Sequence, residues 1–169
     1  MSDYWDYNIV DKEYEKRINE LYDLSDKLDC EKKTIIEIGT WKGTSAISFS
    51  KKFEKVYSLD IVESSVNNLN NKKIDNITAL LRNDVVVNSF DDTSVDVIYI
   101  DGDHTYGAVL SDLKELTPKV KKGGYICGHD YQGNVTGVQK AVNEFFGRVP
   151  DILTPSHSCD NCQNFAYKI

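Results

Sequence analysis

The sequence predicts an α/β protein whose mostly parallel sheet is covered by helices on both faces. From residue 33 onward, short apolar runs alternate with segments of helical periodicity, and the connections between them are short. This alternation is typical of parallel strands joined by crossover helices. The chain closes with two strand-like runs, 150–154 and 164–169, with no helix between them, so one of the two is expected to be antiparallel. A length of 169 residues suits one such domain with an adequate core.

Each expected strand is a short apolar run. The first, at 34–38, reads Thr-Ile-Ile-Glu-Ile and is ended by Gly39, a pattern typical of a buried parallel strand. Four further runs are predicted to be strands in the same way: 56–59, 77–81, 95–100 and 125–127.

Helical segments are expected between these strands. One begins near Thr44 or Ser45, either of which can cap it. A polar helix is predicted at 64–73, and an apolar stripe at helical spacing predicts another at 105–117, after which Pro118 and two glycines break the chain. Apolar residues at 138–146 mark a last helix.

The N-terminal part, 1–28, differs in character from the expected domain at 29–169. Apolar residues there recur at helical spacing and predict one amphipathic helix: Tyr14, Ile18, Leu21 and Leu28. A polar arm ahead of it carries three aromatic residues, Tyr4, Trp5 and Tyr7. Two interpretations stay open for this part: a helix packed on the domain with a frayed arm, or a lid or wall of a substrate pocket.

Composition and charge exclude several classes of protein. The net charge of -7 argues against a nucleic-acid partner, because a protein that binds nucleic acid normally has a basic face. Only three of the 20 cationic residues are arginines, at 17, 82 and 148, so arginine forks that recognise phosphate are not expected. No apolar run approaches the roughly 20 residues of a membrane span, and the first residues lack the features of a secretory signal. With four scattered cysteines, a cytoplasmic protein without membrane contact is expected.

Polar residues follow four of the predicted strands, where ligands bind in open α/β sheets. Gly39 and Gly43 lie in a strand-to-helix turn and let a ligand approach the backbone, although the spacing is neither that of a dinucleotide loop nor that of a phosphate loop. Asp60 follows Gly39 by 21 residues, where a carboxylate can accept both hydroxyls of a ribose. The other strand ends carry Arg-Asn-Asp at 82–84, Asp-Gly-Asp-His-Thr-Tyr at 101–106 and Gly-His-Asp-Tyr at 128–131.

In this order the motifs resemble the class I S-adenosylmethionine-dependent methyltransferases, especially a small group with D-G-D-H-[ST]-Y followed by G-G-x-I-x-G-H-D-Y. The resemblance extends from Thr34 to Phe146. It implies a Rossmann-like, seven-stranded sheet with an antiparallel last strand, and S-adenosylmethionine as cofactor. The methionine part would lie over the first glycine loop, the ribose on the acid after the second strand and the adenine beyond it. The implied cofactor-binding residues are Glu37, Gly39, Thr40, Trp41, Gly43, Thr44, Ser45, Asp60, Ile61, Asp84, Asp101 and Asp103.

The resemblance also implies a candidate metal site. Metal-dependent O-methyltransferases of the catechol and caffeoyl-CoA type carry an acid after the fourth strand and a pair of ligands after the fifth, which fall here on Asp101, His129 and Asp130. Because Mg²⁺ prefers oxygen ligands, the histidine suits Mn²⁺, Fe²⁺ or Zn²⁺ better, and a site without metal is the alternative.

The same register places His104 where the catechol enzymes carry their catalytic lysine. We hypothesise that His104 or His129 removes the proton of an acceptor hydroxyl while Asp101 orients that hydroxyl, directly or through a metal. The alternative for each histidine is a structural role in its loop.

The expected function is methyl transfer to a hydroxyl of a small molecule, with a sugar or glycan as the first guess. The chain has little beyond the core, so we expect Tyr106, Tyr131 and the loop at 132–136 to form the acceptor pocket, completed by a second copy in a homodimer or by the rest of a larger polypeptide. The main alternative is a module that binds S-adenosylmethionine without turnover and supports another enzyme.

Two further readings of the sequence are disfavoured. The missing G-x-G-x-x-G makes a nucleotide-binding oxidoreductase remote. The Cys159-x-x-Cys162 segment is interpreted as a plain turn in preference to a zinc or redox site, because no second such pair is present.

Overall fold

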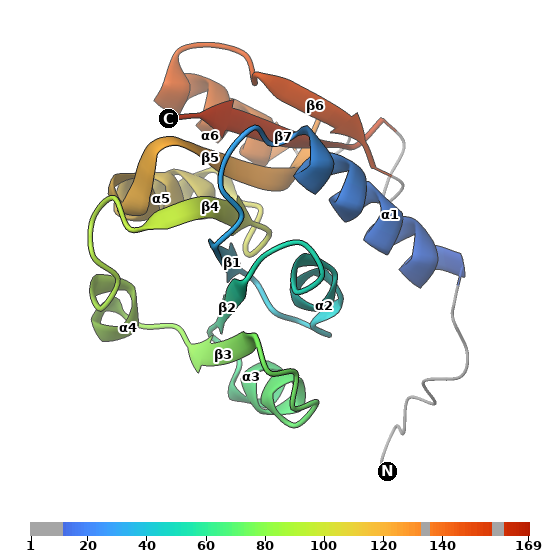
Figure 1. Ribbon diagram of the computed structural model, residues 1–169. Helices are drawn as coiled ribbons and strands as arrows, with labels where there is room; N and C mark the ends of the chain where they lie inside the picture. Colours follow the sequence, from blue (N-terminus) through green and yellow to red (C-terminus); the bar gives the residue numbers. More distant parts are fainter. Residues whose placement is uncertain (1–11, 133–135, 157–160) are drawn as a thin grey trace.

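The computed structural model describes residues 12–132, 136–156 and 161–169, and these form a single seven-stranded sheet flanked by helices (Figure 1). The strand order is β3-β2-β1-β4-β5-β7-β6. The first five strands run parallel, whereas β7 is antiparallel to both β5 and β6. The predicted α/β fold with an antiparallel last strand is therefore confirmed. The strands are β1 (Thr34–Ile38), β2 (Lys55–Asp60), β3 (Ile77–Leu81), β4 (Val95–Ile100), β5 (Val120–Tyr131), β6 (Ile152–Pro155) and β7 (Gln163–Lys168).

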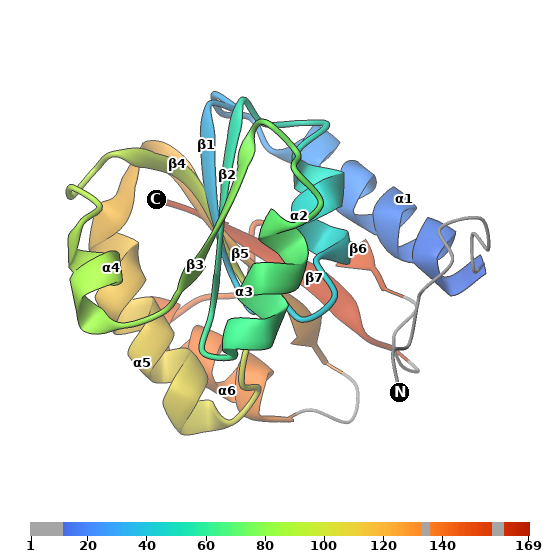
Figure 2. The same ribbon diagram turned by 90° about the horizontal axis from the view of Figure 1, so that it is seen from below.

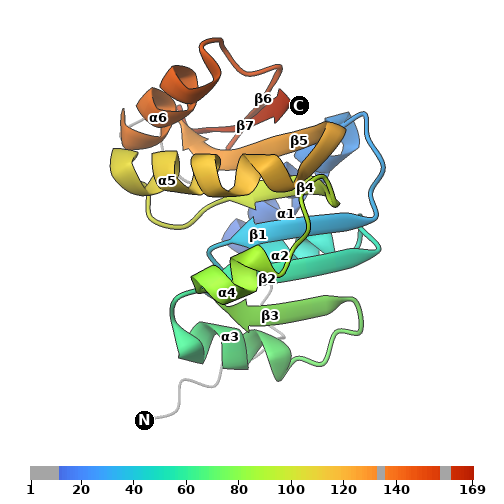
Figure 3. The same ribbon diagram turned by 90° about the vertical axis from the view of Figure 1, so that its left-hand side faces the viewer.

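Helices cover both faces of the sheet. The helices α4, α5 and α6 lie on one side and α1 and α2 on the other, as the views in Figure 2 and Figure 3 show. None of the helices in the described ranges has the length and apolar character that a membrane crossing requires. The helices are α1 (Lys12–Lys27), α2 (Thr44–Phe49), α3 (Glu63–Asn70), α4 (Asp84–Asn88), α5 (Tyr106–Leu116) and α6 (Thr136–Phe146), with a short 3-10 turn at Thr117–Lys119.

Two apolar clusters, one on each face, form the core. Every residue of β4 is buried, as expected for a parallel strand covered on both sides. On the face of α1, α2 and α3, the α1 residues Leu21 and Leu24 are 0% and 1% exposed and pack in one cluster with Ile35 of β1. The predicted amphipathic helix thus contributes its apolar stripe to the same core as the sheet.

Three local details differ from the sequence expectations. Helix α2 begins at Thr44, but its N-cap is Gly43 in the left-handed conformation, so the prediction that Thr44 or Ser45 caps it is wrong. Helix α4 was not expected, because its sequence is short and rich in valine, which favours strands; Asn83 caps it by accepting a hydrogen bond from the Val86 N–H. Strand β5 is also longer than 125–127 and includes the Gly-His-Asp-Tyr segment.

Three expectations concern residues outside the described ranges. They are the aromatic arm with Tyr4, Trp5 and Tyr7, most of the loop at 132–136, and Cys159 with its turn.

Candidate functional site

The ends of β1 and β4 lie next to each other at the carboxyl edge of the sheet, where the strand order reverses. The Asp101 N–H donates to the Ile38 carbonyl at 2.9 Å. Gly39 has φ +98°, and a Cβ there would lie 2.2 Å from the Asp101 carbonyl oxygen. Only glycine permits this approach, so the loop after β1 packs directly on the chain after β4. This is the crevice in which open α/β sheets bind ligands.

Asp60, at the end of β2, anchors the glycine loop. Its Oδ2 accepts hydrogen bonds from the backbone N–H of Thr40 at 2.8 Å and of Trp41 at 3.0 Å. Its Oδ1 accepts from the Val62 N–H at 2.8 Å. The carboxylate predicted to hold a ribose is therefore fixed in position by the loop predicted to lie under the methionine part.

A polar chain supports the loop from below. Glu37 is fully buried and accepts a hydrogen bond from the Ser58 hydroxyl at 2.6 Å, and the hydroxyls of Ser58 and Thr40 lie 2.7 Å apart. Burial raises the pKa of Glu37 to about 7, although hydrogen bonds from Ser45 and Ser58 oppose the rise. Glu37 thus reaches the loop through one intervening serine.

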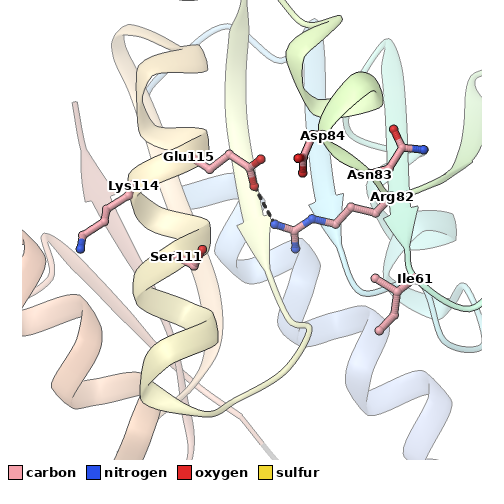
Figure 4. Close-up of a pocket in the computed structure, with 7 residues that line it drawn as sticks. All are labelled: Ile61, Arg82, Asn83, Asp84, Ser111, Lys114 and Glu115. Atoms are coloured by element: carbon pink, nitrogen blue, oxygen red, sulfur yellow. Dashed lines mark hydrogen bonds and ion pairs between the residues drawn. The ribbon is translucent and has the colours of Figure 1, made fainter.

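A cavity of about 590 Å³ opens beside the residues predicted to contact adenine (Figure 4). Ile61 borders it and is 78% exposed. Arg82 crosses from the end of β3 to α5, where it pairs with Asp112 at 2.5 Å and with Glu115 at 2.9 Å. The cavity is lined by Ile61, Arg82, Asn83, Asp84, Ser111, Lys114 and Glu115.

Two histidines and two aspartates converge at the carboxyl ends of β4 and β5. The His104 ring lies between two carboxylates, with its Nε2 3.4 Å from Asp101 Oδ1 and its Nδ1 3.2 Å from Asp130 Oδ2. The other oxygen of Asp130 lies 3.0 Å from His129 Nδ1, which is also 3.9 Å from Asp101 Oδ1. The structure therefore brings together all four of the residues predicted to be catalytic or metal-binding.

The two histidines differ in exposure and in partners. The His129 side chain is 5% exposed, and its Nε2 lies 2.6 Å from the Ser156 hydroxyl. The His104 side chain is 37% exposed. The hydrogen bond to Asp101 is the main cause that raises the pKa of His104; the charges of Asp130 and Asp103 add to it, and burial opposes it. His104 is thus the histidine that a bound molecule can reach.

Two residues that were predicted to contact a ligand form hydrogen bonds within the protein. Asp103 Oδ1 accepts the Thr105 N–H at 2.8 Å and stabilises the turn that starts α5. Tyr131, expected to line the acceptor pocket, is 3% exposed and donates its hydroxyl to Asn143 at 3.1 Å. Tyr131 is therefore part of the core, whereas Tyr106 is only partly buried.

Arg17 of α1 belongs to the site, and the sequence reasoning missed it. Its Nη2 donates to Asp101 Oδ2 at 2.5 Å and to the Tyr99 hydroxyl at 3.0 Å. Burial alone would lower the pKa of Arg17, but Tyr99, Asp101 and Glu20 more than offset this and raise it. A signal was present: position 17 is three residues after Tyr14 and four before Leu21, inside the apolar stripe, where a charged side chain needs a buried partner.

Glu20 and Ser156 connect Arg17 to His129. Glu20 Oε2 lies 3.8 Å from Arg17 Nη1 and accepts the Ser156 hydroxyl at 3.2 Å, and Ser156 in turn contacts His129. The polar contacts thereby close into a ring, which we call the polar ring. Its members are Arg17, Glu20, Asp101, His104, His129, Asp130 and Ser156.

One part of the polar ring has the donors of a metal site. In the described part of the chain, Asp101, His104 and Asp130 each offer one ligand atom, and these atoms lie within 4.8 Å of one another. The group contains His104 where the sequence analysis expected His129. One imidazole with two carboxylates suits Mn²⁺, Fe²⁺ or Zn²⁺ better than Mg²⁺, so the donor types fit a divalent transition-metal ion.

Comparison with known families decides what kind of domain this is. Residues 36–131 match the model of a family described as a methyltransferase domain. The match covers more than half of the chain and runs from within β1 to the end of β5, with the loops described above. The chain belongs to the methyltransferase domain family. The resemblance to class I S-adenosylmethionine-dependent methyltransferases is thus confirmed for family and fold.

Solved structures share the fold of this methyltransferase domain. An O-methyltransferase from Bacillus cereus, solved in complex with SAH, superposes with a TM-score of 0.71 at 15% identity, covering 90% of this chain and 80% of that one. A putative O-methyltransferase from Klebsiella pneumoniae gives a TM-score of 0.65 at 19% identity, covering 96% and 83%.

A curated relative is longer than this methyltransferase domain. Uncharacterized protein R132 of Acanthamoeba polyphaga mimivirus is 25% identical over 140 residues, which cover 74% of this chain and 63% of that protein. The chain therefore spans less than two thirds of the length of this relative.

Proposed function

We propose that this methyltransferase domain transfers a methyl group from S-adenosylmethionine to a hydroxyl of a small molecule, with a sugar or glycan as the acceptor class. The observation that carries the proposal is the contact between Gly39 and Asp101 at the switch point of the sheet. It joins the loop suited to the cofactor to the group of acids and histidines suited to the acceptor. Family membership supplies the reaction class.

The residues at the carboxyl edge fit the cofactor. Trp41 and Ile61 are 72% and 78% exposed, and large apolar side chains left open beside a glycine loop suit contact with a ligand that covers them. Asp60 suits a ribose hydroxyl through Oδ1, which within the described ranges accepts only the Val62 N–H and can accept one more hydrogen bond, whereas Oδ2 already accepts two. When bound, S-adenosylmethionine supplies an electrophilic methyl group.

The acceptor side provides a base with a fixed orientation. His104 lies between Asp101 and Asp130. When its ring is neutral, Nδ1 keeps its proton and donates to Asp130 at 3.2 Å, and the unprotonated Nε2, which is 3.4 Å from Asp101, takes the proton of an acceptor hydroxyl. A positioned base is worth about 10²–10⁴-fold in rate. His129 is enclosed by Asp130 and Ser156, so in this proposal it supports Asp130 and does not touch the acceptor.

The charge of the site favours a neutral, hydroxyl-rich acceptor. Asp101 and Asp130 can accept hydrogen bonds from hydroxyl groups but repel an anionic acceptor. Arg82, which borders the cavity near Ile61, is paired with two acids. These features support a sugar over a phosphorylated or carboxylated substrate.

A labelled methyl-transfer assay tests the proposal. The protein is incubated with isotopically labelled S-adenosylmethionine and separate panels of neutral sugars, anionic sugars and catechols. We expect label in an ether-linked product from neutral sugars, and its loss in His104→Ala. Tight binding of S-adenosylhomocysteine with no transfer to any hydroxylated acceptor would contradict the proposal and favour the non-catalytic alternative.

A further inference from the structure

Asp101 is held from both sides by basic groups, and one of them comes from outside the sheet. Its Oδ1 faces His104, at 3.4 Å, and its Oδ2 accepts Arg17 Nη2 at 2.5 Å. The Arg17 side chain is 20% exposed, and the same Nη2 contacts the fully buried Tyr99 hydroxyl at 3.0 Å. The guanidinium is therefore a fixed component of the site.

The position of Arg17 is set by the packing of α1. Leu21 and Leu24, one and two turns further along the helix, are buried in the core cluster that contains β1 and β2 residues. Tyr99, which fixes the guanidinium from the sheet, donates its own hydroxyl to Asn164 of β7 at 3.2 Å. Helix and sheet thus position the two ends of the same ion pair independently.

We propose that Arg17 is a positioning residue that supplies to Asp101 the positive charge a divalent ion would otherwise supply. The donor group of Asp101, His104 and Asp130 then carries two carboxylate charges, one of which Arg17 compensates. One oxygen of Asp101 is occupied, and a positive charge a few ångströms away repels a metal ion. The site is consequently a weak metal site, and methyl transfer by the function proposed above, on which this part rests, does not depend on an added metal.

Mn²⁺ binding measured by electron paramagnetic resonance and by calorimetry tests this inference without any turnover. Wild type is expected to bind Mn²⁺ only in the millimolar range, and Arg17→Gln about tenfold or more tightly, because removing one charge removes the repulsion. Arg17→Lys keeps the charge and is expected to stay near wild type. Arg148→Gln, which removes an arginine from an exposed pair with Asp151, is the matched control and is expected to leave the affinity unchanged.

Two results would overturn the inference. One is micromolar Mn²⁺ binding by wild type, which needs no variant and so applies even if Arg17→Gln does not fold. The other is a folded Arg17→Gln whose Mn²⁺ affinity is equal to or below that of wild type. Asp101→Asn in the Arg17→Gln background identifies the site, since it is expected to abolish the gained binding. If the metal results hold while no acceptor is methylated, the proposed function fails and the assignment of Arg17 stands.

Discussion

At the scale of single residues, the two histidines show how environment separates two side chains of the same type. Each has a partner at both ring nitrogens, but the His129 side chain is 5% exposed, whereas the His104 side chain is 37% exposed between two carboxylates. The sequence motifs could not separate them, because one follows β4 and the other lies near the end of β5, and these two parallel strands end at the same edge. Burial distinguishes them, and burial depends on α1 and β6, which are distant in the sequence.

The proposed role of His104 as a base predicts a specific pH dependence. Its pKa is raised, chiefly by the hydrogen bond to Asp101, and the base is active only when neutral, so kcat/KM is expected to rise with pH through a value above 6.5. His104→Ala is expected to lower kcat by about 10²–10⁴-fold while the affinity for S-adenosylhomocysteine stays near wild type. A flat pH profile, or a loss of cofactor affinity equal to the loss of rate, would argue against a base at this position.

Glu37 predicts a pH-dependent stability. Its pKa is about 7 in the folded protein against 4.5 for the free side chain, so its contribution favours folding below pH 4.5 and is lost as pH rises through 7. From pH 4.5 to pH 7, Glu37→Gln is expected to gain about 3 kcal/mol of unfolding free energy relative to wild type, because only wild type loses the contribution of the protonated acid. Urea unfolding at several pH values measures it, with the exposed Glu54→Gln as control. The same pH trend in both variants would contradict a special role of the buried acid.

At the scale of elements, the junction of the β1 and β4 loops depends on one glycine. Gly39→Ala adds a Cβ 2.2 Å from a backbone oxygen at a φ of +98°, so we expect a loss of stability of about 2 kcal/mol or more and a loss of S-adenosylhomocysteine binding. Gly107→Ala is the control, because it adds a Cβ to α5 with nothing within 4 Å. Thermal unfolding and calorimetry should separate the two; equal behaviour would show that the junction is not constrained.

The burial of α1 predicts that shortening one of its apolar side chains lowers the free energy of unfolding as much as in a core helix. Leu24 is 1% exposed within the cluster that includes β1, so Leu24→Ala is expected to cost about 2–5 kcal/mol of unfolding free energy. A mobile lid would lose almost nothing on the same change. Chemical denaturation of the variant therefore chooses between the two interpretations left open for the N-terminal part, with the exposed Asp26→Ala as control.

The helices and strands that could be predicted from the sequence were those marked by a pattern within a few consecutive residues. The runs at 34–38 and 95–100 could be recognised as β1 and β4 because short, mostly apolar runs of that length are typical of strands buried on both faces. Helix α4 was missed because three consecutive valines contradict helix propensity, and a tertiary environment overrode it. The capping of α2 was mispredicted because a left-handed glycine at the N-cap leaves no side-chain signature.

At the scale of the whole molecule, the topology explains why the candidate site was largely predictable. Parallel strands bring their carboxyl ends to one edge, so Asp60 and Asp101 could be placed near each other from the sequence alone. Arg17, Glu20 and Ser156 could not, because they come from elements at the two ends of the chain. Their place in the polar ring follows from the packing of α1 against α2 and β6.

A crystal structure with bound S-adenosylhomocysteine is the measurement that tests the central claim most directly. The claim predicts density across the carboxyl edge, with the ribose on Asp60, the adenine beside Ile61 and the sulfur turned toward Asp101 and His104. Density on another face of the domain, or no density at concentrations that saturate the protein in solution, would contradict it.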